Sequence, residues 1–104
     1  MPRSKRVSIC GYYHVSNRGA GLCEVFLRDE DRLFFIMQMC GFSKQYQFTI
    51  HGYALLSNGY NILIETTKEN LPHIMKSING QYTSYFNRKY GRRGYLWEGR
   101  YQSW

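Results

Sequence analysis

The sequence predicts an α+β fold in which an antiparallel sheet carries two helices on one of its faces. Two observations lead to this prediction. Residues of high β-propensity gather in four separate runs, and two segments with apolar residues at helical spacing lie between the first and second runs and between the third and fourth. The order is therefore β-α-β-β-α-β, which is typical of the split β-α-β, ferredoxin-like arrangement of four strands and two helices.

The first half of the chain contains the first predicted strand and the first predicted helix. Residues 9–16 are rich in aromatic and β-branched side chains, and a loop over residues 17–21 follows them. The acidic residues 29–31 stand where a helix favours an N-cap and negative charge. This helix is expected to end near Gly41, and its apolar stripe consists of Leu33, Ile36, Met37 and Cys40.

A β-hairpin is predicted in the middle of the chain. Residues 47–57 and 60–67 both have strand character, and the tripeptide Ser57-Asn58-Gly59 separates them. Asn-Gly between two apolar runs is the strongest short-range hairpin signal, so the two strands are expected to pair in antiparallel.

The second predicted helix begins after Asn70, a suitable N-cap, and runs to about Lys89. Pro72 falls in its first turn, where a missing N–H does no harm. A loop with two glycines follows, and residues 95–104 are predicted to form the last strand. The apolar stripe of the helix consists of Leu71, Ile74, Met75, Ile78, Tyr82 and Tyr85 or Phe86.

Length and composition indicate one globular domain over residues 1–104. Hydrophobic residues make up 43% of the chain and charged residues 20%, which argues against disorder. No apolar run approaches the ~20 residues of a membrane span, and the basic start lacks the apolar core of a signal peptide. The three cysteines form no CxxC pair. We therefore expect a cytoplasmic protein with reduced thiols and no membrane partner.

Positive charge is concentrated at both ends of the chain. The net charge is +7; residues 1–18 hold four basic side chains and no acid, and residues 76–104 hold six basic side chains and one acid. A clustered positive field attracts phosphate backbones. An anionic partner such as a nucleic acid is therefore expected.

Four segments of the sequence form a recognisable set by their order and spacing. They are YHVSNRG at 13–19, FTIHGYALLSNGYNILIET at 48–66, NLPHIMKSINGQYTSYFNRKYG at 70–91 and GYLWEGRYQS at 94–103, and YFNRKYGRRGYLWEGRY is the most specific stretch. Together they resemble the IS200-like single-tyrosine transposases, and most closely the branch associated with repetitive extragenic palindromes (REP).

The resemblance implies a ferredoxin-like, usually dimeric protein that recognises single-stranded or hairpin DNA. It also implies metal-dependent strand cleavage and joining through a phosphotyrosine. In that chemistry a His-hydrophobe-His motif helps to hold a divalent ion such as Mg²⁺ or Mn²⁺, and a tyrosine from a later helix attacks the phosphate. DNA is thus the implied partner, and a homodimer is the implied assembly.

The residues that this chemistry needs are replaced in the sequence. The motif aligns on Gly59-Tyr60-Asn61, so both histidine positions have changed, and an Asn carbonyl is a poor substitute for imidazole. The tyrosine helix would follow the last strand, but the sequence ends at Trp104, before that helix. We therefore expect no intact catalytic residue, no metal site, no cofactor and no cleavage.

Two histidines and two tyrosines are the candidates for a site rebuilt elsewhere in the chain. His14 on the first strand is expected to face Asn61 across the sheet, and His51 lies on the second strand. Two histidines without a carboxylate or thiolate make a weak metal site. Tyrosines 82 and 85 lie on the apolar stripe of the second helix, where a core role is the ordinary one.

DNA binding is expected to survive without the chemistry. Cationic side chains and exposed rings suit single strands, because the charges neutralise phosphates and the rings stack on unpaired bases. Such side chains are interleaved from the end of the second helix onward. The predicted DNA-binding residues are Arg18, Arg88, Lys89, Arg92, Arg93, Arg100 and Trp97.

Several alternatives stay open at this point. One is RNA binding through the open face of the sheet, with Tyr12 or Tyr13 and Tyr60 as the stacking rings. Another is a structural role as the dimerising partner of an active relative. A third is a remnant of a mobile element without function, and a fourth is a fragment of a longer enzyme whose tyrosine helix is supplied elsewhere.

Overall fold

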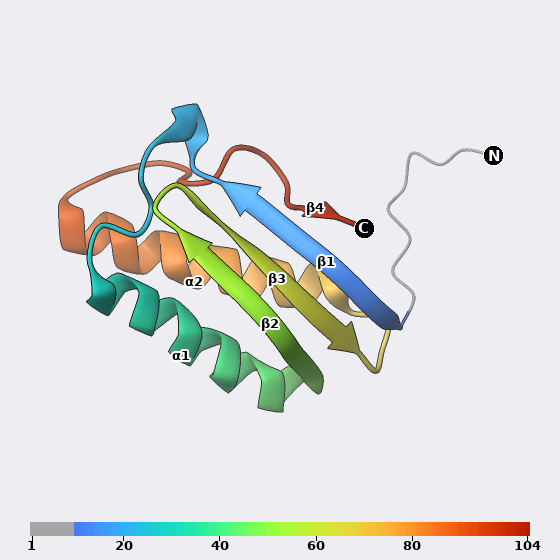
Figure 1. Ribbon diagram of the computed structural model, residues 1–104. Coiled ribbons are helices and arrows are strands. Elements are labelled where there is room, and N and C mark those ends of the chain that lie inside the picture. Colours follow the sequence, from blue (N-terminus) through green and yellow to red (C-terminus); the bar gives the residue numbers. More distant parts are fainter. Residues whose placement is uncertain (1–9) are drawn as a thin grey trace.

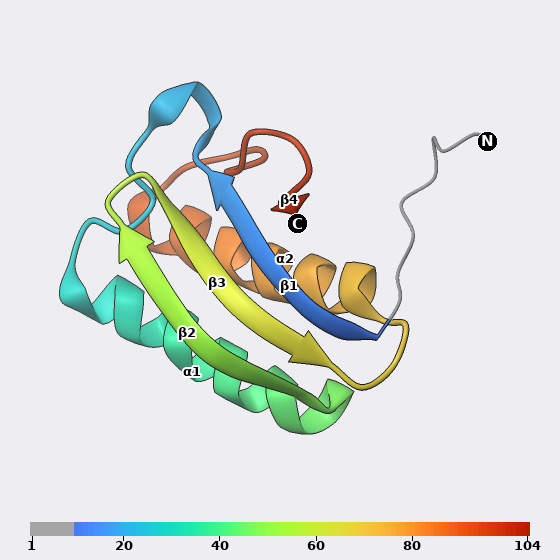
Figure 2. The ribbon, with the colours of Figure 1, turned by 45° about the vertical axis from the view of Figure 1, so that its right-hand side comes forward.

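The computed structural model describes residues 10–104, which form one four-stranded antiparallel sheet with two helices packed on one of its faces (Figures 1 and 2). The α+β, ferredoxin-like prediction is confirmed. Ile9, the first residue of the first predicted strand, and the basic residues 3, 5 and 6 lie outside the described residues. The elements are β1 (Gly11–Arg18), a 3₁₀ turn (Ala20–Leu22), α1 (Asp29–Tyr46), β2 (Phe48–Leu56), β3 (Gly59–Thr66), α2 (Leu71–Tyr90) and β4 (Gln102–Ser103).

The sheet has the strand order β2-β3-β1-β4, so β1 and β3 are its central strands. The predicted hairpin is confirmed, because Leu56 pairs with Gly59 across a two-residue turn. In the β1–β3 ladder, His14 lies opposite Leu63 and Ser16 lies opposite Asn61. Because strand side chains alternate between faces, the even-numbered residues of β1 and the odd-numbered residues of β3 share the face away from the helices. We call this the open face.

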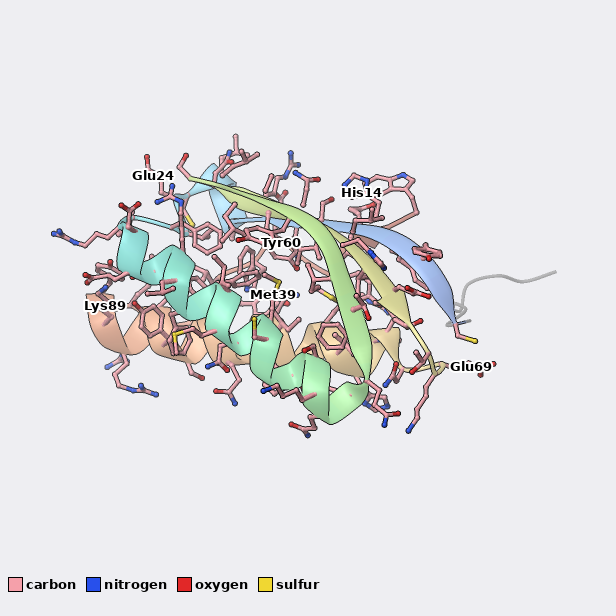
Figure 3. The ribbon with its side chains drawn as sticks, turned by 60° about the horizontal axis from the view of Figure 1, so that its bottom comes forward. His14, Glu24, Met39, Tyr60, Glu69 and Lys89 are labelled. Atoms are coloured by element: carbon pink, nitrogen blue, oxygen red, sulfur yellow. The ribbon has the colours of Figure 1, made fainter. Side chains whose placement is uncertain are left out.

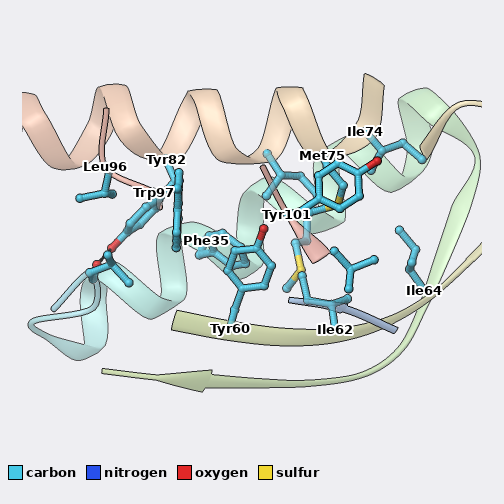
Figure 4. Packing of buried hydrophobic residues seen from close by; sticks show 14 of the residues in the cluster. Phe35, Tyr60, Ile62, Ile64, Ile74, Met75, Tyr82, Leu96, Trp97 and Tyr101 are labelled. Atoms are coloured by element: carbon cyan, nitrogen blue, oxygen red, sulfur yellow. Dashed lines mark hydrogen bonds between the residues drawn. The ribbon is translucent and has the colours of Figure 1, made fainter. Parts of the chain in front are cut away.

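Both helices bury one side against the other face of the sheet. On α2 the predicted stripe is confirmed, since residues 71, 74, 75, 78, 82 and 86 are buried. Aromatic rings fill much of this core (Figure 4), and Tyr82 contacts Phe26, Phe35 and Trp97. The Tyr82 hydroxyl donates a hydrogen bond to the Val25 carbonyl oxygen. Burial raises the pKa of Tyr82 well above its ordinary value, so its phenol stays neutral.

The predicted stripe of α1 is wrong. Its buried apolar residues are Phe35 and Met39, whereas Leu33 is 56% exposed and Met37 is 61% exposed. Both sets have helical spacing, so periodicity alone does not choose between them. The side of α1 that contains the Phe35 ring packs on the sheet, because burial of that side removes more apolar area from water.

Helix α1 also continues past its predicted end at Gly41. A glycine inside a helix costs roughly 1 kcal/mol relative to alanine. Burial beyond it offsets this cost, because Phe42 and Tyr46 pack against the core and the Tyr46 hydroxyl lies 3.0 Å from Ser77 Oγ on α2. The helix ends at Tyr46, and the C-cap residue Gln47 adopts a left-handed conformation with φ of 58°.

The last predicted strand, residues 95–104, is mostly wrong. Only Gln102 and Ser103 form a strand, opposite Ser16 and Val15 of β1, and Trp97 makes an isolated bridge to Gly19. Gly99 lies between these two contacts with φ of 68°, a left-handed conformation that interrupts extended backbone. The segment therefore pairs with β1 at Val15 and Ser16 and bridges to Gly19 just after β1, but it does not pair along its length.

Neither helix in residues 10–104 combines the length and the apolar character that a bilayer span requires.

Candidate nucleic-acid interface

Residues 59–61 begin strand β3 and point alternately to the two sides of the sheet. Asn61 lies on the open face, whereas Tyr60 is 1% exposed and lies between the sheet and the helices (Figure 3). The Tyr60 hydroxyl donates a hydrogen bond to Asn79 Oδ1 at 2.8 Å, and burial raises the pKa of the Tyr60 phenol. Tyr60 is therefore a core residue and offers no ring to a base.

Gly59 stands at a position where strand β1 leaves no room for a side chain. A Cβ at Gly59 would clash with the backbone oxygen of Asn17 and lie 3.0 Å from the Cα of Arg18. The neighbouring atoms belong to the central strand rather than to a flexible side chain, so they cannot move aside at low cost. A histidine in this position is incompatible with the observed pairing of β1 and β3.

Asn61 contacts His14 across the open face, as the sequence predicts. His14 Nε2 lies 3.0 Å from Asn61 Oδ1, and the His14 ring stacks on Trp104 with their centroids 4.9 Å apart. His51 belongs to a separate group: its Nε2 lies 2.9 Å from Glu65 Oε1, and its ring contacts Tyr12. The two histidines therefore do not converge on one point.

The donor set around residues 59–61 does not fit a divalent metal. Glycine supplies no ligand, and Asn61 Oδ1 is already in contact with His14. Within residues 10–104 there is no group of three or more His, Cys, Asp or Glu side chains placed to hold a metal ion. Positions 59–61 therefore do not supply a complete set of ligands for such an ion.

A hollow of about 540 Å³ opens on the sheet beside Gly59 and Asn61. Neutral polar side chains dominate its walls. Its cation, Arg18, is paired, because Arg18 Nε donates to Glu98 Oε1 at 2.8 Å. The lining residues are Ser16, Asn17, Arg18, Leu22, Leu56, Asn58, Gly59, Tyr60, Asn61, Glu98 and Gln102.

The predicted DNA-binding cations fall into two groups in the structure. Arg88, Arg93 and Arg100 are exposed, whereas Arg92 is partly buried and supports the loop that it belongs to. Arg92 donates to Asn87 Oδ1 at 3.2 Å and to the Tyr95 carbonyl oxygen at 3.3 Å. The exposed group thus lies at the end of α2 and in the segment that leads to β4.

Lys89 belongs to the second group, because two carboxylates hold it. Its Nζ lies 2.7 Å from Asp31 Oδ1 and 2.6 Å from Glu30 Oε2, which joins the end of α2 to the start of α1 (Figure 3). Hydrogen bonds to Asp31 and Glu30 raise the pKa of Lys89. This lysine is therefore part of the structure rather than a free phosphate contact.

Asp31 is the buried centre of this contact, and sequence reasoning assigned it only a role in helix capping. Its side chain is fully buried and accepts hydrogen bonds from the hydroxyls of Tyr85 and Tyr90 at 2.7 and 2.6 Å. Burial alone would raise the pKa of Asp31, but bonds from Lys89, from both tyrosines and from the Arg28 backbone lower it to about 2. The spacing Tyr-x₃-Lys-Tyr at the end of α2 is the available sequence signal.

The aromatic side chains of the same segment also divide by burial. Trp97 is buried and donates from Nε1 to the Asn79 carbonyl oxygen at 3.3 Å, so its ring cannot stack on a base as the sequence suggested. Tyr101 is buried as well. Tyr95 is 57% exposed and Trp104 is 66% exposed, so both rings present surface to solvent, and Trp104 also stacks on His14.

Two solved structures share this fold over the whole chain. One is a REP-associated tyrosine transposase bound to a REP hairpin, with 13% sequence identity and a TM-score of 0.76. The other is a candidate transposase from Deinococcus radiodurans R1, with 15% identity and a TM-score of 0.73. The present chain spans 61% of the length of the first and 85% of the second.

No protein-family model matches the sequence, and a search of curated proteins finds no match either.

Proposed function

We propose that this chain is a DNA-binding relative of the IS200-like, REP-associated transposases that recognises single-stranded or hairpin DNA without cleaving it. The observation that carries the proposal is the set of exposed arginines and aromatic rings in residues 88–104. Arg88, Arg93 and Arg100 supply charge, and Tyr95 and Trp104 supply stacking surfaces. The net charge of +7 adds a general attraction to phosphate.

The fold supports the same proposal. A protein with this fold is bound to a REP hairpin, and its likeness covers the entire present chain. The four sequence segments that resemble the family include the region from α2 to β4. Hairpin or single-stranded DNA is therefore the partner that both the surface chemistry and the likeness favour.

Loss of catalysis is part of the proposal and is supported by Gly59 and Asn61. We expect no nicked product and no covalent protein–DNA adduct when the chain is incubated with a DNA hairpin labelled at both ends and with Mn²⁺ or Mg²⁺. A denaturing gel measures both products. A band of covalent adduct that disappears on adding a chelator would contradict this expectation.

The binding prediction concerns two exposed arginines. Arg93→Ala together with Arg100→Ala should weaken binding to a DNA hairpin with an unpaired flank by about tenfold at near-physiological salt. The slope of log K against log salt should become shallower by about 1.4, since each lost contact to a single strand removes about 0.7. Fluorescence anisotropy over a range of salt concentrations measures both quantities.

The control removes the same charge elsewhere. Lys68 and Lys76 are exposed cations at the other end of α2, so Lys68→Ala with Lys76→Ala should leave the affinity within about twofold. Equal losses of DNA affinity in both double variants would mean that binding depends on overall positive charge and not on Arg93 and Arg100 in particular. The fully duplex DNA and the RNA hairpin complete the comparison, and tighter binding to RNA would favour the RNA alternative.

A homodimer and a cytoplasmic location also belong to this proposal.

A further inference from the structure

The hollow beside Gly59 lies on the open face of the sheet, on the side away from both helices. The 3₁₀ turn and the turn between β2 and β3 lie at the same end of the sheet (Figures 1 and 2), and the Gly19 N–H donates to the Asn58 carbonyl oxygen at 2.9 Å. The hollow has a volume of about 540 Å³, within the range of roughly 300–1,000 Å³ that is typical of sites for small organic ligands.

A row of neutral polar side chains crosses the sheet in this hollow. Asn61 of β3 pairs with Ser16 of β1, and Ser16 pairs with Gln102 of β4. Directly opposite residues of antiparallel strands have their Cβ atoms about 5 Å apart on the same face, so the three side chains are neighbours. Two amides and one hydroxyl therefore present both donors and acceptors to a ligand.

Most of the hydrogen-bonding capacity of this row is unused within residues 10–104. The side chains of Ser16 and Gln102 make no hydrogen bond to another described residue. Asn61 uses its Oδ1 toward His14 Nε2 at 3.0 Å, and its Nδ2 has no partner in the same part of the chain. The row can therefore bind a ligand without breaking a contact of the fold.

The walls of the hollow contain no unpaired ionic side chain. Its two ionic residues, Arg18 and Glu98, bind each other at 2.8 Å. A phosphate would have to compete with Glu98 for Arg18, whereas an uncharged ligand would not. The hollow therefore favours a neutral ligand that is rich in donors and acceptors.

Two exposed leucines supply apolar surface beside the polar row. Leu56 at the end of β2 is 52% exposed, and Leu22 in the 3₁₀ turn is 60% exposed. Leu22 also has φ of 62°, a left-handed conformation that is costly for a branched side chain and persists only where the surroundings enforce it. Apolar walls with a few placed polar groups are typical of sites for flat heterocyclic ligands.

We propose that the hollow binds one unpaired nucleobase, with the edge of the base against Asn61, Ser16 and Gln102 and its face against the leucines. Amides suit base edges, because an amide donates one hydrogen bond and accepts another in the same plane, as in the pairing of Asn or Gln with adenine. A ligand of this kind differs from the metal-held phosphate that the family resemblance implies at these positions.

The further step, that this base belongs to bound DNA, rests on the proposed function. Unpaired bases can turn their hydrogen-bonding edges toward a protein, whereas a paired base keeps its Watson–Crick edge against its partner. The hollow would thus add a selection for unpaired nucleotides to the general attraction between arginines and phosphates.

Two-dimensional ¹H–¹⁵N NMR of the full chain with free deoxynucleosides tests the site. Deoxyadenosine, deoxycytidine and thymidine carry a base but no phosphate, so the net charge of +7 does not attract them. At least one of them should shift the side-chain NH₂ signals of Asn61 and Gln102, with a dissociation constant on the order of 1 mM. The sugar 2-deoxyribose, which lacks a base, should shift neither signal.

Variants locate the binding in the hollow. Gln102→Ala removes one amide from the row and should raise the dissociation constant of the nucleoside about fivefold. Gln81→Ala is the matched control, because it removes an exposed glutamine from α2 on the other side of the sheet, and it should leave the constant unchanged. Arg93→Ala with Arg100→Ala should also leave it unchanged, since a nucleoside has no phosphate.

A scan with abasic nucleotides tests whether the base comes from DNA. In a hairpin with an unpaired flank, replacing the flank nucleotides one at a time by an abasic nucleotide should lower the affinity about tenfold at one position. In the Gln102→Ala protein the loss at that position should shrink to below about threefold, because the contact is already weakened.

The outcomes distinguish the nucleobase site from the proposed function. Absence of a shift at Asn61 and Gln102 with all three nucleosides, or an equal shift with 2-deoxyribose, overturns the nucleobase site. Nucleoside binding without a position that is sensitive to abasic replacement overturns the assignment of the base to DNA. Failure of the intact hairpin to bind overturns the proposed function, and the nucleoside titration, which needs no DNA, still decides the site.

Discussion

Asp31→Asn should lower the free energy of unfolding by about 3 kcal/mol at pH 7, because it breaks a buried ion pair. Four further donors support this pair: the hydroxyls of Tyr85 and Tyr90 and the backbone N–H groups of Leu27 and Arg28. The aspartate side chain is fully buried, and Lys89, Tyr85 and Tyr90 from α2 all bind it. The amide keeps the shape but loses the charge that attracts Lys89. Urea unfolding followed by circular dichroism measures the change.

The same carboxylate should make the protein sensitive to acid. Folding lowers the pKa of Asp31 from 3.8 to about 2, so the folded state binds the proton less readily than the unfolded state. The stabilisation, on the order of 2 kcal/mol, is present above pH 4 and is lost as the pH falls toward 2. Asp31→Asn should therefore flatten this part of the stability profile, which a loss of packing alone would not do.

Asp29 provides the matched control. It lies in the same helical turn, its carboxylate is fully exposed, and its contact with Arg32 is 3.7 Å long. Asp29→Asn should change the free energy of unfolding by less than about 0.5 kcal/mol. Similar losses for the two variants would mean that the helix dipole, rather than the buried contact, accounts for the effect.

Gly59→His should destabilise the protein by about 2–3 kcal/mol, and it should not create a metal site. The new Cβ collides with backbone atoms of Asn17 and Arg18, so strands β1 and β3 must separate where they pair. Gly59→His combined with Asn61→His should accordingly give no heat with Mn²⁺ in isothermal titration at micromolar protein.

Gly52→His is the control for the glycine substitution. Gly52 also lies in the sheet, but no atom stands within 4 Å of the position that its Cβ would take. We expect a change in the free energy of unfolding below about 1 kcal/mol for this variant. A stable Gly59→His protein, or tight Mn²⁺ binding by the double histidine variant, would show that the strand pairing adapts to the side chain.

Local patterns were sufficient to predict most of the fold. Asn58 and Gly59 specify the hairpin through their turn chemistry, and the spacing from Leu71 to Phe86 specifies the buried side of α2. Both signals lie within a few residues of the structure that they determine. The ferredoxin-like arrangement follows from the order of the elements.

Helix α1 shows where such patterns stop being sufficient. Leu33, Met37 and Cys40 have the same spacing as a core stripe, yet Phe35 and Met39 face the sheet. The choice depends on the total area that each side buries against distant strands, which a local window does not contain.

The candidate site was predictable only where it depends on neighbouring residues of one strand or on the pairing of adjacent strands. Its positions 59–61 lie on β3 as expected, and His14 faces Asn61. The burial of Trp97 and the capture of Lys89 depend on partners that are distant in sequence, Asn79 and Asp31. The sequence of a basic segment does not show whether a given charged or aromatic side chain is exposed or is already buried or paired within the fold.

The pairing of the last described residues with β1 also constrains the order of folding. The backbone groups of His14 and Trp104 bond to each other in both directions, at 3.1 and 2.9 Å. These residues are about ninety positions apart, so joining them early would close a very large loop at a high entropic cost. The cost falls once β1, β3 and α2 have assembled, because α2 then carries the chain back to the sheet. Residues 97–104 should therefore dock late in folding, and the hollow beside Gly59 takes its final shape only in that last step.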